Sequence, residues 1–480
     1  MCLTYQVLWL NTLCQKNCKE KILANLIKSM AKAKRKEVSR KRKIKQRKHL
    51  NADALFLKIY KGFEEIKDHR PGNVQHALAD VLMTGFAMFS LKDPSLLRFD
   101  ERRLKSPHNL MSVYGMKSIP CDTSVRAILD DLAPDVLRSS FKDAFRALQR
   151  GKVLERMVFM QGAYLLNLDG TGYFSSGKLH SEACMKKVNK KTGKVTYYMQ
   201  AVGAVIAHPS QKEVIPLCPE IIKKQDGEKK MDCERNAVKR LLKKFRQDHP
   251  HLKVIVNEDA LASNAPHIED LEKYGCHYIL GVKKGDHKYL FQHVNHAIET
   301  GDAVTVTMTD ENQKEIKHNF RIFYDMPLNK SNSDKLVTFV EYWEENTETG
   351  KVQRFTWITD LDVDKDNVYQ FMRGARARWK IENETFNTLK NQGYNFGHNY
   401  GLGKRNLSEV FVLLMMLAFL VDQIQQLCCP LFNKARKAWK SKRSLWEKIR
   451  CKFHEFKIKT MEDLYQSLLY HEQVPLVIAG

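Results

Sequence analysis

Apolar positions change their spacing along the chain, and each change marks a different kind of segment. In residues 51–151 they recur at helical intervals, as at Leu55, Ile59 and Phe63, which predicts a helical region. From Met157 onward, short continuous apolar runs closed by turn residues alternate with helical patterns. Such runs are typical of buried strands, so the middle of the chain is predicted to be α/β.

The order of these segments predicts how the strands meet. Strands are expected at Tyr164–Gly172, Tyr197–His208, Glu213–Leu217, Lys253–Val256 and His277–Val282, with helices at Cys233–Gln247 and from Asn264 to Gly275. This order resembles a ribonuclease-H-like core, in which the first and fourth strands lie side by side. Asp169 and Asp259 would end those two strands. Neighbouring carboxylates repel each other, which favours a hard divalent cation between them.

Two later segments depart from this alternation. Val304, Val306 and Met308 alternate with threonines, which predicts a β-rich insertion over residues 301–356. Further on, Leu407–Cys428 is apolar enough to be a helix buried on all sides. Its longest apolar run covers about twelve residues, fewer than the roughly twenty that cross a membrane, so no membrane span is expected.

Arg373–Lys390 carries the third acidic candidate. On one regular helix of about 100° per residue, Glu382 falls in the same apolar sector as Trp379, while Glu384 falls outside it. A buried acid is costly unless it is paired or binds a cation. Two interpretations stay open: Glu382 forms an ion pair with Arg378 four residues earlier, or it is the third carboxylate of a metal site.

Charge identifies the class of partner. The 480 residues include 80 Lys and Arg against 55 Asp and Glu, a net charge of +25, which favours a polyanion, most often nucleic acid. The densest basic block, residues 31–50, is predicted to be a phosphate-binding arm or simply a solvated tail. The basic segment Ala435–Lys459 is either a second DNA-contact surface or an ordinary solvated helix. Eleven cysteines without framework spacing indicate free thiols in a reducing compartment.

Three short motifs together resemble those of the DDE transposases of bacterial insertion sequences, in the group with a Tyr-Arg-Glu-Lys signature. They are Leu168–Thr171, Asn257–Leu261 and Arg378–Asn383. The resemblance covers about residues 155–428. It implies an α/β fold with a ribonuclease-H-like mixed sheet flanked by helices, a β-rich insertion and an all-helical N-terminal domain.

The resemblance also implies the roles of individual residues. Asp169, Asp259 and Glu382 would be the catalytic residues and the ligands of two Mg²⁺ or Mn²⁺ ions, with Asp169 shared between them. Arg378 would be the signature arginine that contacts DNA phosphate. The signature tyrosine falls on an alanine and the signature lysine on a leucine, and Lys390, one place after that leucine, is the substitute phosphate contact.

The implied function is metal-dependent cleavage of double-stranded DNA at transposon ends and strand transfer into target DNA. A homodimer on paired ends is expected, without membrane association, in the cytoplasm of a bacterium at the nucleoid. Two alternatives stay open: a ribonuclease-H-like nuclease without strand transfer, and a non-catalytic DNA-binding protein derived from a transposase. The predicted segments are a basic arm (1–50), a helical DNA-binding or dimerisation domain (51–155), a first core part (156–300), the β insertion (301–356), a second core part (357–428) and a basic helical C-terminal region (429–480).

Overall fold

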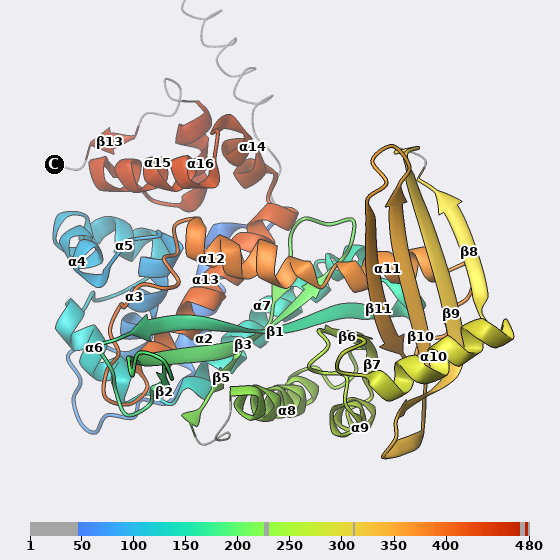
Figure 1. The fold of residues 1–480 in the computed structure, drawn as a ribbon. Helices are drawn as coiled ribbons and strands as arrows, with labels where there is room; N and C mark the ends of the chain where they lie inside the picture. Colours follow the sequence, from blue (N-terminus) through green and yellow to red (C-terminus); the bar gives the residue numbers. More distant parts are fainter. Residues whose placement is uncertain (1–46, 225–229, 311–312, 471–475, 479–480) are drawn as a thin grey trace, which may run out of the picture. The chain divides into compact units, whose positions relative to one another are not determined.

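The computed structural model describes residues 47–224, 230–310, 313–470 and 476–478. Most of the predicted basic arm, residues 1–46, therefore lies outside the described residues. Residues 47–480 form one compact unit, built on one eleven-stranded mixed sheet with helices around it (Figure 1).

The sheet has the strand order β2-β3-β1-β6-β7-β11-β10-β9-β8, and β4 and β5 pair with β3. β1 and β6 are parallel, as are β6 and β7, and the other pairs are antiparallel. The core strands are β1 (Tyr164–Ser176), β2 (Met185–Val188), β3 (Val195–Ala207), β4 (Ile215–Pro216), β5 (Glu220–Ile222), β6 (Val254–Glu258) and β7 (His277–Gly281). Because β1 and β6 are the first and fourth predicted strands, their predicted adjacency is confirmed.

Helices cover both faces of the core strands (Figure 1). Side chains alternate between the faces of a strand, so Leu165 of β1 and Ile255 of β6 pack in one hydrophobic cluster with Phe371 of α11 (Val368–Arg376). The residues that alternate with Leu165 and Ile255 along these two strands point to the other face of the sheet, where α8 (Lys230–Asp248) and α9 (Ala265–Lys273) lie (Figure 1). The predicted mixed sheet flanked by helices is therefore confirmed.

The β-rich insertion continues the core sheet. It consists of β8 (Val304–Thr309), β9 (Ile316–Asn329), β10 (Asn332–Asn346) and β11 (Val352–Thr359), and the helix α10 (Lys288–Thr300) precedes it. β11 pairs with β10 over its whole length and with β7 through Trp357–Thr359. The predicted boundary between residues 356 and 357 therefore falls inside one strand.

A long apolar helix joins the sheet to the helical regions. α13 spans Leu407–Cys428, as predicted, and all of its residues are buried. By length and composition it is the one helix in the described ranges that could cross a membrane, but 94% of its most apolar window is buried inside the protein, as in a core helix. The N-terminal helices around it are α2 (Ala52–Glu64), α3 (Leu78–Ser90), α4 (Leu96–Lys105), α5 (Pro107–Tyr114), α6 (Asp122–Asp130) and α7 (Arg138–Arg150). The C-terminal helices are α14 (Pro430–Ala438), α15 (Lys442–Glu455) and α16 (Met461–Leu469), followed by the strand β13 (Val477–Ile478), which pairs with β12 (Phe456–Lys457).

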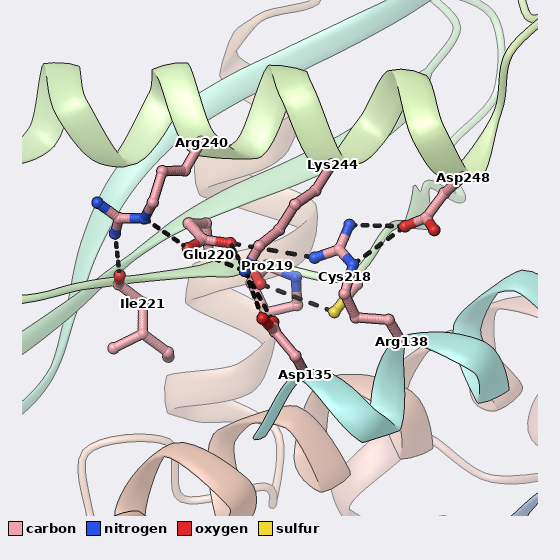
Figure 2. Close-up of polar contacts among 9 residues, drawn as sticks. All are labelled: Asp135, Arg138, Cys218, Pro219, Glu220, Ile221, Arg240, Lys244 and Asp248. Carbon is pink, nitrogen blue, oxygen red and sulfur yellow. Dashed lines mark hydrogen bonds and ion pairs between the residues drawn. The ribbon is translucent and has the colours of Figure 1, made fainter. Parts of the chain in front are cut away.

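Buried charge holds the N-terminal helices to the sheet. Glu220 of β5 is 4% exposed and lies 2.9 Å from Arg240 Nε and 3.1 Å from Lys244 Nζ, both on α8. Arg138 of α7 lies 4.0 Å from Glu220 and 2.6 Å from Asp248 (Figure 2). We call these five residues the Glu220 network; it ties α7, β5 and α8 together.

Candidate active site

Asp169 lies within β1 rather than at its end. The strand continues to Ser176 because its second half pairs with β3, so the predicted strand end at Gly172 is wrong. The parallel pairing with β6, however, stops at Asn167 and Asn257. Asp169 therefore lies just beyond the last pair of β1 and β6. By the two-residue period of a strand it shares the α11 face with Asn167.

Asp259 follows β6 directly, as predicted. Its Oδ1 accepts a hydrogen bond of 3.0 Å from the backbone N–H of Leu261, which holds the carboxylate at the start of the turn that follows β6. A cavity of about 50 Å³ opens beside it. The residues that line this cavity are Glu234, Arg235, Val238, Glu258, Asp259, Leu261, Ala262 and His267.

The continuous helix predicted for Arg373–Lys390 is interrupted. α11 ends at Arg376, a tight turn follows, a π-helical segment covers Ile381–Phe386, and α12 covers Asn387–Asn391. Because the winding of the backbone changes here, positions calculated at 100° per residue do not apply across the segment. The prediction that Trp379 and Glu382 share a buried apolar face is therefore wrong: Trp379 is 53% exposed and Glu382 is also exposed. π-helical turns inside helices are rare and occur frequently at functional sites.

Arg378 contacts Asp169 instead of Glu382. Its Nη1 lies 3.5 Å from Asp169 Oδ2, and both side chains are partly exposed. The alternative in which Arg378 pairs with Glu382 is therefore not the arrangement in the structure. Lys390 is exposed on α12, and no contact in the described part of the chain joins it to the three carboxylates.

The three predicted carboxylates act on one another. Burial raises the pKa of the Asp169 carboxyl to about 6, while the positive charge of Arg378 opposes this rise. The negative charges of Asp259 and Glu382 raise the same pKa further. The fold thus brings together three acids that lie far apart in the sequence.

This donor set fits a divalent cation by its chemistry. Hard cations such as Mg²⁺ prefer carboxylate oxygens, and like charges that raise a pKa mark a place where added positive charge is favourable. The spacing does not by itself form a closed ligand set. Among the described residues, no three His, Cys, Asp or Glu side chains are close enough to hold a metal ion.

A comparison with known families decides what this arrangement is. A family model described as the transposase DDE domain matches residues 232–420. The chain carries a transposase DDE domain. The resemblance to the DDE transposases is thereby confirmed, and so is the ribonuclease-H-like α/β fold, while an origin in a bacterial insertion sequence stays a prediction.

The family match covers some of the candidate site residues and not others. It includes Asp259, Arg378, Glu382 and Lys390, and it begins after Asp169. No curated protein matches the chain. The roles of the individual residues in the DDE domain therefore stay predictions.

Three residues that shape this site were given no role on the basis of the sequence. Asn167 and Asn257 are fully buried and hydrogen-bond to the end of α11. Gly203 of β3 pairs with Asp169, and a Cβ on Gly203 would lie 2.8 Å from the Phe386 ring. A signal for the asparagines exists in the sequence, because each stands two residues before a candidate aspartate. Nothing in the sequence distinguishes Gly203.

Proposed function

We propose that the chain is a transposase that cleaves DNA at transposon ends and transfers the freed strand into target DNA, with a divalent metal as cofactor. Three carboxylates that share one electrostatic environment carry this proposal, and two of them, Asp259 and Glu382, lie inside the matched DDE range. Water would attack the phosphorus at the transposon end, and the P–O3′ bond would break to leave a 3′-hydroxyl. That hydroxyl would attack a phosphorus of the target. In that step a target P–O3′ bond breaks as the new phosphodiester forms, and a target 3′-hydroxyl leaves, whereas the first step consumes water and forms no phosphodiester.

Asp169, Asp259 and Glu382 would hold Mg²⁺ or Mn²⁺. When bound, such ions neutralise charge on the entering and leaving oxygens of a phosphoryl transfer. Arg378 is held beside the same carboxylates and would bind a non-bridging phosphate oxygen, since guanidinium groups match phosphate geometry. Lys390 would contact the DNA backbone further along.

The partner would be double-stranded DNA, bound by a homodimer on paired ends. Charge supports DNA as the partner, because the chain carries +25 at pH 7 and phosphate contacts dominate such binding. The cytoplasm of a bacterium, at the nucleoid, is the compartment this function requires.

The test is a cleavage and strand-transfer assay on plasmid DNA that contains the sequences flanking the coding region, with Mg²⁺ or Mn²⁺. Wild type should nick and join DNA, and Glu382→Gln should do neither. Glu384→Gln is the matched control and should remain active. Nicking without joining would favour the nuclease alternative. DNA binding without any cleavage in either metal would favour the non-catalytic alternative.

A further inference from the structure

Two asparagines hold the same position on neighbouring strands. Asn167 precedes Asp169 by two residues, Asn257 precedes Asp259 by two, and the two asparagines are direct partners in the parallel pairing of β1 with β6. Both are 0% exposed. Because partners in register point to the same face of a sheet, the two amides lie side by side beneath the end of α11.

Asn257 donates to two of the last carbonyls of α11, and Asn167 donates to the turn that follows. Asn167 Nδ2 donates to Ala377 O at 2.7 Å. Asn257 Nδ2 donates to Gly374 O at 3.0 Å and to Ala375 O at 3.3 Å. These carbonyls lie where the α-helix ends, directly before Arg378.

The backbone is tightly wound at this point. The N–H groups of Ala377, Arg378 and Lys380 each donate to a carbonyl three residues earlier, a 3₁₀ pattern that is common at helix ends. The π-helical segment with Glu382 begins immediately afterwards. The winding therefore changes within a few residues, and the two amides bind the chain at that change.

We infer that Asn167 and Asn257 are positioning residues that fix where Arg378 and Glu382 stand relative to Asp169 and Asp259. The amides join the strands of the two aspartates to the turn that leads into the third acid. The inference rests on the proposed function, because that function gives the reason why Arg378 and Glu382 must be positioned. The way in which the two amides hold the turn rests on their hydrogen bonds alone.

Stability alone does not explain the two asparagines. The Oδ1 atoms of both are buried without a hydrogen-bond partner among the described residues, and a buried unsatisfied acceptor destabilises the folded state. The α11 carbonyls already accept backbone N–H groups, so they would keep a partner without the amides. Leucine has a similar shape and no polar atom to bury, so it should be tolerated at both positions if folding were all that mattered.

The test compares Asn167→Leu and Asn257→Leu with Asn109→Leu. Asn109 is also 0% exposed and donates to two carbonyls, those of Phe453 and Phe456, but it joins α5 to the C-terminal region. The measurements are hydrogen exchange by mass spectrometry, Mn²⁺ affinity by calorimetry, thermal unfolding, and kcat and KM on cleavable DNA.

Asn167→Leu and Asn257→Leu should speed amide exchange in residues 377–386 by about fivefold, as expected for the loss of one hydrogen bond. Mn²⁺ affinity should fall by about tenfold or more, as for other residues that orient metal ligands. kcat should fall while KM for DNA stays unchanged, and the unfolding midpoint should move little. Asn109→Leu should lower the midpoint and speed exchange near residues 453–458, with Mn²⁺ affinity intact.

The inference is overturned if exchange in residues 377–386 is unchanged, or if it rises while Mn²⁺ affinity and kcat stay at wild-type values. Asn257→Ser, which adds no bulk, keeps the test open should a leucine variant not fold. Its shorter donor should give a smaller loss of the same kind. If wild type itself binds no Mn²⁺ and cleaves no DNA, the proposed function fails, whereas the exchange comparison still decides whether the amides hold the turn.

Discussion

Glu220 and Asp169 lie on opposite sides of one strand, because β5 and β1 both pair with β3. They also lie on opposite faces of the sheet, where their charges are balanced very differently. Glu220 has the three cations of the Glu220 network around it. Among the residues that the structure describes, Asp169 has only Arg378 within ion-pair distance, at 3.5 Å, and two further carboxylates raise its pKa.

The difference separates a structural charge from a functional one. A buried acid surrounded by cations holds its neighbours in place, and removing it takes away the charge that those cations share. An acid among other acids destabilises the folded state through charge repulsion. This arrangement is favourable only where the site binds a cation or acts on a phosphate group. The same sheet thus contains a charge cluster that holds the fold together and one that is suited to chemistry.

The largest expected effect is that of Asp169→Asn on DNA cleavage. We expect a loss of at least about a hundredfold, because the amide removes an anionic ligand from the proposed metal site. The unfolding midpoint should stay equal or rise, since a half-buried charge facing like charges disappears. Cleavage kinetics and calorimetric unfolding of the same preparation measure both. Unchanged cleavage would refute the three-carboxylate account.

Glu220→Gln should have the reverse profile. The amide keeps the shape of the side chain but removes the buried charge shared by Arg240, Lys244 and Arg138. Lys244 keeps Asp135 and Arg138 keeps Asp248, and we expect a loss of about 3 kcal/mol in the free energy of unfolding. Cleavage by the protein that remains folded should be close to normal. Urea unfolding and a cleavage assay below the unfolding transition measure the two quantities.

Glu341→Gln is the matched control for Glu220. Glu341 also pairs with two cations, Arg321 and Arg354, but at 3.3 Å and 3.4 Å, and its side chain is 15% exposed against 4% for Glu220. Such pairs contribute about 0–1 kcal/mol. If both glutamine variants lose equally little stability, the Glu220 network is not what holds the N-terminal helices to the sheet.

The order of elements could be predicted from the sequence, while the roles of the three acids stay predictions. Continuous apolar runs identify buried strands whatever lies around them, which is why β1, β6 and α13 were found close to their actual positions. Asp259 follows β6 as expected. These features depend on local composition, and local composition is what a sequence pattern reports.

The geometry around Glu382 could not be predicted in the same way. A helical wheel assumes one constant phase, whereas the chain passes from α-helix through a 3₁₀ turn into a π-helical segment between Arg376 and Phe386. This change depends on contacts with Asn167, Asn257 and Gly203, which belong to other strands. Long-range contacts override local periodicity here, as tertiary context commonly does.

Gly203→Ala tests how closely the Glu382 segment must approach the sheet. The added Cβ would lie 2.8 Å from the Phe386 ring, so the ring and the segment must shift. We expect a loss of about 2 kcal/mol in stability, typical of overpacking, and roughly a tenfold loss of Mn²⁺ affinity through the displaced glutamate. Thermal unfolding and calorimetry measure these changes.

Gly285→Ala is the control for the added methyl group, because nothing lies within 4 Å of its Cβ position. It should leave both quantities at wild-type values. Equal stability and Mn²⁺ affinity in Gly203→Ala and wild type would mean that Phe386 moves freely and that the close approach of the segment to β3 has no role in placing Glu382.

The smallest expected effect concerns the pH dependence of stability beside the Glu220 network. Burial between the Phe145 and Phe245 rings, together with nearby cations, lowers the pKa of His249 to about 4, while Asp248 opposes this. Between about pH 6.5 and pH 4 the unfolded chain binds the proton more readily than the folded chain. Stability should therefore decline as pH falls through this window, by about 1–2 kcal/mol after allowance for solvent contact.

His249→Gln should remove this decline, so the difference in unfolding free energy between wild type and variant should shrink from pH 7 to pH 4. His251→Gln changes an exposed histidine two residues away and should leave the wild-type curve unchanged. Urea unfolding at several pH values measures all three proteins. Parallel curves for wild type and His249→Gln would mean that the His249 ring charges as easily folded as unfolded, so that neither its burial nor the nearby Lys142, Arg138 and Arg146 opposes its charging.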